Sequence, residues 1–323
     1  MQPSRRVTIE DVAARAGVHA GTVSRALNRP EQVAPATRER IEAIVQELDF
    51  VPNRAARGLI TGRTDNVAVI VPDITNPTFA ALVRAAGRAA RDADLQLLLV
   101  DTGEHAEEEV RAARTLAHEV DGFVVLSPRR LHRELGALGS TPAVFVNRPV
   151  RGRASVVIRT ARAVDDAVRH LVGHGHVGLA YLGGPKGSWA ATERRDAARR
   201  TSRDTGIAMH EVTVGAPTFE AAASTADAIL ATGASAVLAF NGQMALGVIA
   251  GLAQRGIAVP GDVSVVGGDD VPMAAMTAPP LTALSVPTGE AGATAVELLR
   301  SDGPSVELAG TLVVRGSTGP VTS

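Results

Sequence analysis

The chain has 323 residues, which is longer than one ordinary domain, and its 45% hydrophobic and 21% charged residues are a globular balance. Because 33 basic and 34 acidic side chains give a net charge of -1, the total charge excludes a bulk electrostatic preference for nucleic acid or membrane. The absence of cysteine excludes disulfides, thiolate metal sites and cysteine nucleophiles. Residues 1–12 contain no apolar core of a signal peptide, so we expect a cytoplasmic protein.

The basic residues are concentrated at the N-terminal end. Residues 1–63 contain ten arginines and seven acidic residues, so a basic N-terminal part precedes a mildly acidic remainder. Any signal for nucleic acid is therefore local rather than global.

The N-terminal part is predicted to form three short helices. Thr8 and Asp11 have the spacing of a capping box, and Gly17 is placed to end the first helix. A second helix is expected to run to about Leu27, and a third to start near Pro35, a residue suited to the first helical position.

From residue 66 onward, short apolar runs alternate with amphipathic helices. This alternation over about 260 residues predicts two doubly wound parallel sheets. An apolar run at 235–253 has the length of a membrane span, but Asn241, Gly242 and Gln243 interrupt it where a strand should turn into a helix. We interpret that run as soluble core and expect no membrane partner. The expected strands are 67–71, 95–100, 122–126, 143–146, 179–182, 236–240 and 263–266, and the expected helices include 79–92, 107–119 and 164–172.

Ala13, Gly17 and Val23 have the spacing of a helix-turn-helix, with a small residue at the helix crossing, a glycine in the turn and an apolar anchor on the second helix. Together with the segments 7–13, 22–28, 37–41 and 52–56, the chain closely resembles the LacI/GalR family of bacterial transcriptional regulators. The resemblance implies an N-terminal all-α helix-turn-helix head and an α/β core, like periplasmic binding proteins, of two doubly wound parallel-sheet subdomains. The implied divisions are a DNA-binding domain 1–52, a hinge helix 53–63, an N-subdomain 64–159 with 287–309, and a C-subdomain 160–286 with 310–323.

By this resemblance the second helix enters the major groove of double-stranded operator DNA. Arg25 is the expected main reader, because its guanidinium can bond guanine O6 and N7, which contributes roughly 1–3 kcal/mol of discrimination. Thr22, Ser24 and Asn28 are short polar groups suited to phosphates. His19, Ala20 and Gly21 depart from the usual start of this helix, so its capping and base contacts should differ. The predicted DNA-binding residues are Thr8, His19, Ala20, Gly21, Thr22, Ser24, Arg25, Asn28, Thr37, Asn53, Ala56 and Leu59.

The hinge helix is implied to form on the operator. Leu59 matches a leucine wedge inserted from the minor groove, with Ala56 beside it, and such a wedge kinks DNA at a cost of a few kcal/mol. Two heads and two wedges imply a homodimer on a palindromic site. No apolar heptad follows Ser317, so we expect no additional coiled coil.

Further motifs resemble the effector cleft of the family. The implied effector-binding residues are Phe79, Asn147, Trp189, Arg194, Asn241 and Asp269. An arginine, an amide and a carboxylate supply the donors and acceptors of a sugar-like polyol, and no cofactor is implied. Phe79 suits core packing as well as ligand contact, and Trp189 suits packing as well as stacking on a sugar.

Two positions depart from the family pattern around this cleft. Thr78 and Gly268 stand where aromatic residues are usual, so we expect the effector site to depend more on its polar residues.

The sequence therefore predicts a ligand-responsive transcriptional regulator, a repressor rather than an enzyme. A periplasmic sugar carrier fits the core alone, but the N-terminal head argues against it. Catalysis by Asp269 and Asp270, or a metal held by His170, His174 and His176, is disfavoured because neither set shows a further ligand or a defined geometry.

Overall fold

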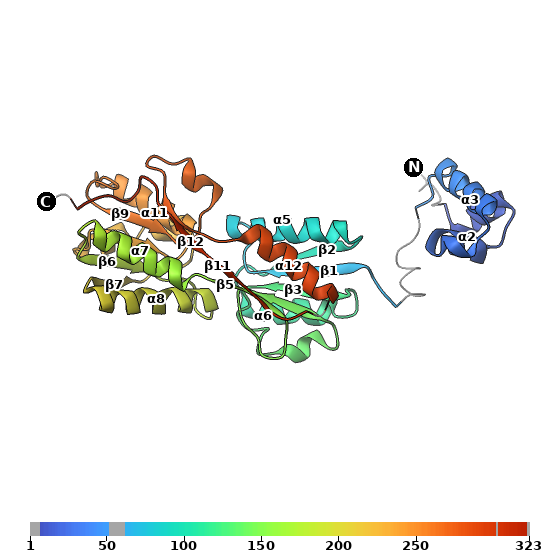
Figure 1. Ribbon diagram of the computed structural model, residues 1–323, viewed down its shortest axis with the longest axis horizontal. Coiled ribbons are helices and arrows are strands. Elements are labelled where there is room, and N and C mark those ends of the chain that lie inside the picture. The colour runs from blue at the N-terminus through green and yellow to red at the C-terminus, as the bar shows by residue number, and fades with distance from the viewer. Residues whose placement is uncertain (1–6, 52–61, 302, 322–323) are drawn as a thin grey trace. The chain divides into compact units, whose positions relative to one another are not determined.

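The computed structural model describes residues 7–51, 62–301 and 303–321. The chain divides into two compact units, 1–64 and 65–323, which we call the head and the body (Figure 1). The hinge segment with Asn53, Ala56 and Leu59 lies outside the described residues, so its helical form remains a prediction.

The head is helical, as its sequence predicts, and its first helix has the expected local signals. The Thr8 hydroxyl accepts from the amide of Asp11, and the Asp11 carboxylate accepts from the amide of Thr8, so the capping box is present. Gly17 ends the helix with φ 64°, a conformation that glycine adopts without steric cost. The head elements are α1 (Ile9–Ala16), α2 (Ala20–Asn28), the 3-10 helix η1 (Pro30–Gln32) and α3 (Pro35–Glu47).

The head helices enclose one small apolar core. Val12, Val23 and Ile41 come from different helices and are all fully buried in the same cluster. Burying side chains of this size contributes about 1.5–3 kcal/mol each, which holds the angle between α1 and α2. Neither α2 nor α3 has a side-chain cap, because His19 and Ala34 stand at their N-cap positions.

The first sheet of the body lies between two layers of helices. Alternate residues of its central strand β1 face opposite ways: Val69 packs in the cluster of α5 and α12, and Ile70 packs in the cluster of α6. Its strand order is β11-β5-β4-β3-β1-β2, with all neighbours parallel. The elements are β1 (Asn66–Val71), α5 (Pro77–Asp92), β2 (Gln96–Asp101), α6 (Ala106–Leu116), β3 (Gly122–Leu126), η2 (Leu135–Leu138), β4 (Ala143–Val146), β5 (Ser155–Arg159), α12 (Thr288–Ser301) and β11 (Val306–Ala309).

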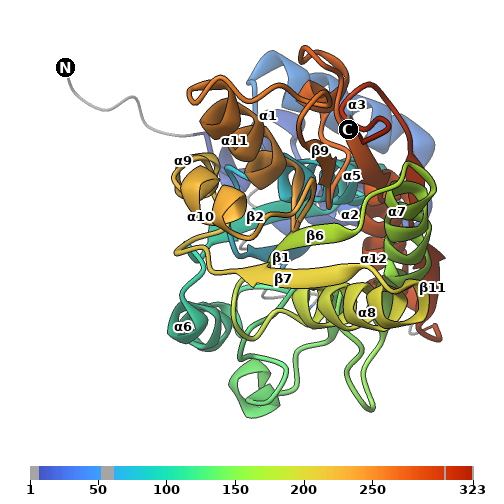
Figure 2. The ribbon, with the colours of Figure 1, turned by 90° about the vertical axis from the view of Figure 1, so that its left-hand side faces the viewer.

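The second sheet repeats this arrangement. Tyr181 of β6 packs toward α7 and α8, while the next residue, Leu182, packs toward α9, α10 and α11. Figure 2 shows α8 on one side of β6 and β7 and α11 on the other. The strand order is β12-β10-β9-β8-β6-β7. The elements are α7 (Ala161–Gly173), β6 (Gly178–Leu182), α8 (Trp189–Thr205), β7 (Ala208–Val212), α9 (Phe219–Ala223), α10 (Ala226–Ala231), β8 (Ala236–Ala239), α11 (Gly242–Ala253), β9 (Ser264–Gly267), η3 (Pro272–Ala275), β10 (Thr282–Ser285) and β12 (Thr311–Val313).

The described chain crosses between the two sheets after β5, after β10 and after β11. The prediction of two doubly wound sheets is confirmed, with one difference: the edge strand β12 runs antiparallel to β10. This strand follows β11 after a single residue, so the chain passes directly from the edge of the first sheet to the edge of the second.

The long apolar run at 235–253 is divided as its polar interruption predicts. Strand β8 ends at Ala239, Asn241 caps the next helix, and α11 begins at Gly242. Within the described part of the chain, no helix is both long and apolar enough to cross a membrane.

Candidate functional site: the α2 surface and the interdomain cleft

The second helix of the head has one buried side and one outward side. Val23 and Ala26 are buried in the head core, whereas Gly21, Arg25 and Asn28 are exposed. The exposed positions are three or four residues apart, so they share one face of the helix. Of the residues predicted to face the bases, His19, Gly21 and Arg25 are exposed and Ala20 is half-buried, and Asn28, which is predicted to contact phosphate, shares the face of Gly21 and Arg25.

Arg25 is the longest side chain on this face. Its Nε donates to the carbonyl of Gly21 at 3.1 Å, which directs the guanidinium along the helix. Its two terminal nitrogens make no hydrogen bond to the described residues, so the fork that recognises guanine is available for DNA.

Several of the other predicted DNA-contacting residues already use their polar groups in hydrogen bonds within the head. The Thr8 hydroxyl is engaged with Asp11 in the capping box, and Asn28 Nδ2 donates to the carbonyl of Ser24 at 2.9 Å. Thr22 and Thr37 are half-buried in the first turns of α2 and α3. These residues suit phosphate contacts at the edge of the face better than base reading.

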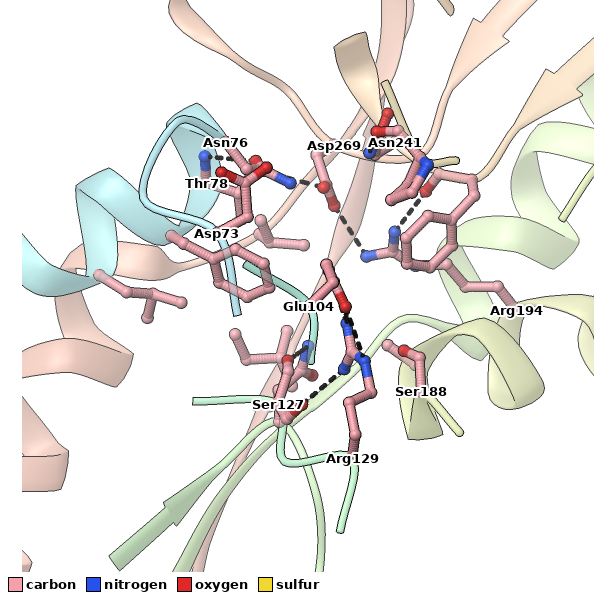
Figure 3. A pocket seen from close by; sticks show the side chains of 18 residues that line it. Asp73, Asn76, Thr78, Glu104, Ser127, Arg129, Ser188, Arg194, Asn241 and Asp269 are labelled. Atoms are coloured by element: carbon pink, nitrogen blue, oxygen red, sulfur yellow. Dashed lines mark hydrogen bonds and ion pairs between the residues drawn. The ribbon is translucent and has the colours of Figure 1, made fainter. Parts of the chain in front are cut away.

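A cleft that is partly open to solvent lies between the two sheets of the body (Figure 3). It is formed where strands of both sheets end, which is the usual ligand position in open α/β sheets. Five predicted effector residues line it: Phe79, Asn147, Arg194, Asn241 and Asp269. These residues are far apart in sequence, and the fold brings them together.

The buried centre of the cleft is an ion pair between Arg194 of α8 and Asp269, which follows β9. Nη2 of Arg194 lies 2.8 Å from Oδ1 of Asp269, and the two side chains are 6% and 8% exposed. Arg194 also donates to Thr160 Oγ1 and to the carbonyl of Phe240. The second Asp269 oxygen accepts from Thr78 Oγ1 at 3.2 Å, so this carboxylate links the two subdomains.

Asn241 is buried and has a structural role. Its Oδ1 accepts from the amide of Met244 at 2.8 Å and caps α11, while its Nδ2 donates to the carbonyl of Pro217 at 3.0 Å. Because Nδ2 carries a second hydrogen, Asn241 can still donate once into the cleft.

Phe79 and Asn147 lie on the first-sheet side of the cleft. Phe79 is in the first turn of α5 and belongs to the apolar core as well as to the cleft wall. Asn147 follows β4 with φ 62°, a conformation that asparagine tolerates, and its Nδ2 donates to Ser127 Oγ at 3.2 Å.

Trp189 is the predicted effector residue that the structure does not bring to the cleft lining. It is the first residue of α8, and the Arg159 guanidinium lies 5.2 Å from the centre of its ring. This cation–π contact agrees with the packing interpretation of Trp189.

Arg129 and Glu104 also line the cleft, although no motif in the sequence indicated them. Arg129 donates through Nε and Nη2 to the two Glu104 oxygens at 2.9 Å, and its side chain is 6% exposed. Burial raises the pKa of Glu104, and the charge and hydrogen bonds of Arg129 oppose that rise. Both residues come shortly after strand ends, which is the one sequence signal that could have indicated them.

The structure also adds an aromatic residue and accounts for a missing one. Phe240 lines the cleft, and its ring centre lies 5.2 Å from the Arg194 guanidinium. A Cβ at Gly268 would lie 1.8 Å from the carbonyl oxygen of Phe240, so no side chain fits there without a backbone shift. Phe240, at the end of the neighbouring strand, is therefore the aromatic residue beside Gly268 in the cleft.

Two of the three histidines that are disfavoured as metal ligands, His170 and His176, make hydrogen bonds with hydroxyl groups. His170 contacts Thr318 Oγ1 at 2.8 Å, and His176 contacts the hydroxyls of Ser235 and Ser264. Among the described residues, no group of three or more histidine or acidic side chains is arranged to hold a metal ion. These contacts fix the C-terminal segment against α7.

A helix-turn-helix head joined to a two-sheet, ligand-cleft body defines the class of transcriptional regulators in which one chain combines DNA binding with small-molecule sensing. Residues 8–53 match the family described as bacterial regulatory proteins, lacI family, and residues 168–318 match a periplasmic binding protein-like domain. The chain is 36% identical to the HTH-type transcriptional regulator CelR of Thermobifida fusca, over 93% of this chain and 92% of that protein.

Solved structures agree with this assignment. A Lac repressor dimer bound to operator and the anti-inducer ONPF is similar with a TM-score of 0.88, at 27% identity over 98% of this chain and 100% of that one. A CelR–cellobiose complex is similar with a TM-score of 0.70, at 30% identity over 97% and 100%. The protein belongs to the LacI family of DNA-binding transcriptional regulators.

Proposed function

We propose that this regulator is a repressor that binds a palindromic operator as a homodimer, and that a sugar-like effector in the cleft changes its affinity for the operator. The observation that carries the proposal is the contact of Thr78 with Asp269, because it joins the two subdomains through the same carboxylate that pairs with Arg194. A ligand that bonds Asp269 competes with Thr78 for it.

The coupling follows from differential affinity. A ligand shifts the balance between two subdomain orientations only if it binds one of them more tightly. The chain passes between the subdomains after β5, β10 and β11, so a change in the cleft changes the relative position of the two sheets. We propose that the hinge, with Asn53, Ala56 and Leu59, transmits this change to the head.

The proposed subdomains are 64–159 with 287–309 and 160–286 with 310–323, and the strand membership of the two sheets supports this division. The proposed effector residues are Phe79, Asn147, Arg194, Asn241 and Asp269.

The nature of the effector is supported by chemistry and by the relatives. Arginine and carboxylate side chains at the cleft centre suit vicinal hydroxyls, and CelR was solved with cellobiose. The dimer on operator DNA seen for the Lac repressor supports the proposed assembly.

The test starts with selection of binding sites from random duplex DNA by the full-length protein. Its affinity for the selected palindrome is then measured by fluorescence anisotropy at several salt concentrations, with and without neutral sugars such as cellobiose and lactose. The proposal expects at least one sugar to change operator affinity five-fold or more. Operator affinity that no bound sugar changes would contradict it.

A further inference from the structure

A second arginine–carboxylate pair lies in the cleft on the first-sheet side, with the Arg129 side chain buried and the Glu104 side chain half-buried. Arg129 follows β3 and Glu104 follows β2, whereas Arg194 and Asp269 belong to the other subdomain. Figure 3 shows the two pairs at separate places in the cleft, with the Glu104 carboxylate turned toward the Arg129 guanidinium.

Arg129 is held rigidly by two acidic residues. The buried carboxylate of Glu109 accepts from the backbone amides of Arg129, Arg130 and Leu131 at 2.7, 2.9 and 3.1 Å. The side chain is then fixed by Glu104 and by the carbonyl of Ser127. A binding group positioned in this way loses little conformational entropy when a ligand arrives.

The two arginines have the same number of unused hydrogen-bond donors. Of the five N–H donors of each guanidinium, three are used by described residues in Arg129 and three in Arg194. Each pair therefore retains two donors beside carboxylate oxygens that can accept further hydrogen bonds. That combination matches hydroxyl groups, which both donate and accept.

The charges in the cleft disfavour an anion. The charged residues among the described cleft lining are Asp73, Glu104, Asp269, Arg129 and Arg194. Both guanidiniums are already paired with a carboxylate, and Asp73 adds a negative charge, so a carboxylate or phosphate on the ligand meets net repulsion.

We infer that the Glu104–Arg129 pair is a second ligand-binding site in the cleft, and that the cleft selects an uncharged ligand with hydroxyl groups over an anionic one. This inference rests on the proposed function, because it assumes that the cleft holds the effector. The pair makes the site reject anionic sugars, because both guanidiniums of the described cleft lining are already paired with a carboxylate.

The test is isothermal titration calorimetry of the full-length protein with cellobiose, lactose, glucose, glucose 6-phosphate and cellobionate. We expect each neutral sugar to bind at least a hundred-fold more tightly than its anionic counterpart: cellobiose more tightly than cellobionate, and glucose more tightly than glucose 6-phosphate. Glu104→Gln, which leaves Arg129 without its paired charge, should reduce the discrimination between cellobiose and cellobionate at least ten-fold. The double variant Glu104→Gln, Arg129→Gln should weaken disaccharide binding at least ten-fold.

The matched control is the neighbouring pair Arg130–Glu107, which is exposed and outside the cleft lining. Glu107→Gln, Arg130→Gln should leave every sugar affinity unchanged. Tighter binding of an anion than of a neutral disaccharide, no binding of either disaccharide, or an unaltered affinity in the Glu104–Arg129 double variant overturns the inference. Failure of the proposed function looks different, because a disaccharide then binds as expected but leaves operator affinity unchanged.

Discussion

Arg194 and Asp269 form an ion pair 2.8 Å long with both side chains almost fully buried. Burying two charges costs several kcal/mol of desolvation per ion, and apolar replacements of similar size are often as stable. The pair is therefore poorly explained by stability alone. Its position in the cleft, with Thr78 on the second carboxylate oxygen, suits ligand binding and the coupling of two subdomains.

Removing one partner of this pair should be costly. Asp269→Ala leaves a buried guanidinium without its counter-ion, so we expect the free energy of unfolding to fall by about 3–5 kcal/mol. The double variant Arg194→Met, Asp269→Leu should recover most of that loss while remaining unable to bind a sugar. Urea denaturation measures the free energy of unfolding of both variants. The control Asp270→Ala breaks the more exposed pair with Arg315, so its loss of unfolding free energy should be smaller. If Asp269→Ala and the double variant lost the same free energy of unfolding, the cost would not come from the unpaired charge of Arg194.

Base recognition is predicted to depend on Arg25. Arg25→Ala should reduce the preference for the selected operator over random DNA by about 1–3 kcal/mol, because the fork that reads guanine is lost. Arg15→Ala is the control: Arg15 is exposed on α1 and pairs with Glu47, so its removal should affect both DNAs alike. Competition anisotropy at constant salt gives the ratio of the affinities for operator and random DNA. If this ratio is the same in Arg25→Ala as in the wild type, Arg25 does not read the bases.

Glycine at 268 is required by its close contact with the carbonyl of Phe240. Gly268→Ala should destabilise the body by about 1–3 kcal/mol through overpacking, and it should disturb the hydrogen bond from Arg194 to the same carbonyl. Gly289→Ala, at the start of α12 where a Cβ meets nothing within 4 Å, should be neutral or stabilising by up to about 1 kcal/mol. Thermal denaturation compares the two, and a stable Gly268→Ala protein contradicts the packing argument.

Acid should destabilise the body partly through His132. Burial, with the charges of Arg148 and Arg133, lowers the pKa of His132 from 6.5 to about 4. In the unfolded chain this histidine takes up a proton below about pH 6.5, whereas in the folded protein it stays neutral to about pH 4, so its contribution to stability is lost across that window as the pH falls.

The variant His132→Gln should therefore show a shallower loss of unfolding free energy between pH 6.5 and 4, and the exposed His118→Gln should match the wild type. Urea denaturation at several pH values across this window provides the measurement. A slope in His132→Gln equal to that of the wild type excludes this histidine as a source of acid sensitivity.

Local signals in the sequence predict much of this fold. The Thr8–Asp11 capping box, Gly17 after the first helix and the polar break at Asn241 each act within a few residues, and the structure has all of them as expected. Alternating apolar runs likewise predict two layered sheets, because burial on both faces of a parallel sheet demands such runs.

The rest of the cleft depends on contacts between distant segments. Arg129 and Glu104 are 25 residues apart and become partners only because β2 and β3 lie on either side of β1 in one sheet. The close approach of Gly268 to the carbonyl of Phe240 likewise needs the pairing of β8 with β9, which no single stretch of sequence specifies. Trp189 shows the converse, since nearness to Arg194 in sequence does not place it in the cleft.

The central claim, that a ligand in the cleft controls binding of the head to DNA, is tested most directly by titrating the selected operator with the full-length protein in the absence and presence of a neutral disaccharide that binds it. The account predicts a change in operator affinity of five-fold or more in the wild-type protein, and none in the variant Arg194→Met, Asp269→Leu, which retains operator binding. A disaccharide that binds the wild-type protein and leaves its operator affinity unchanged would contradict the account.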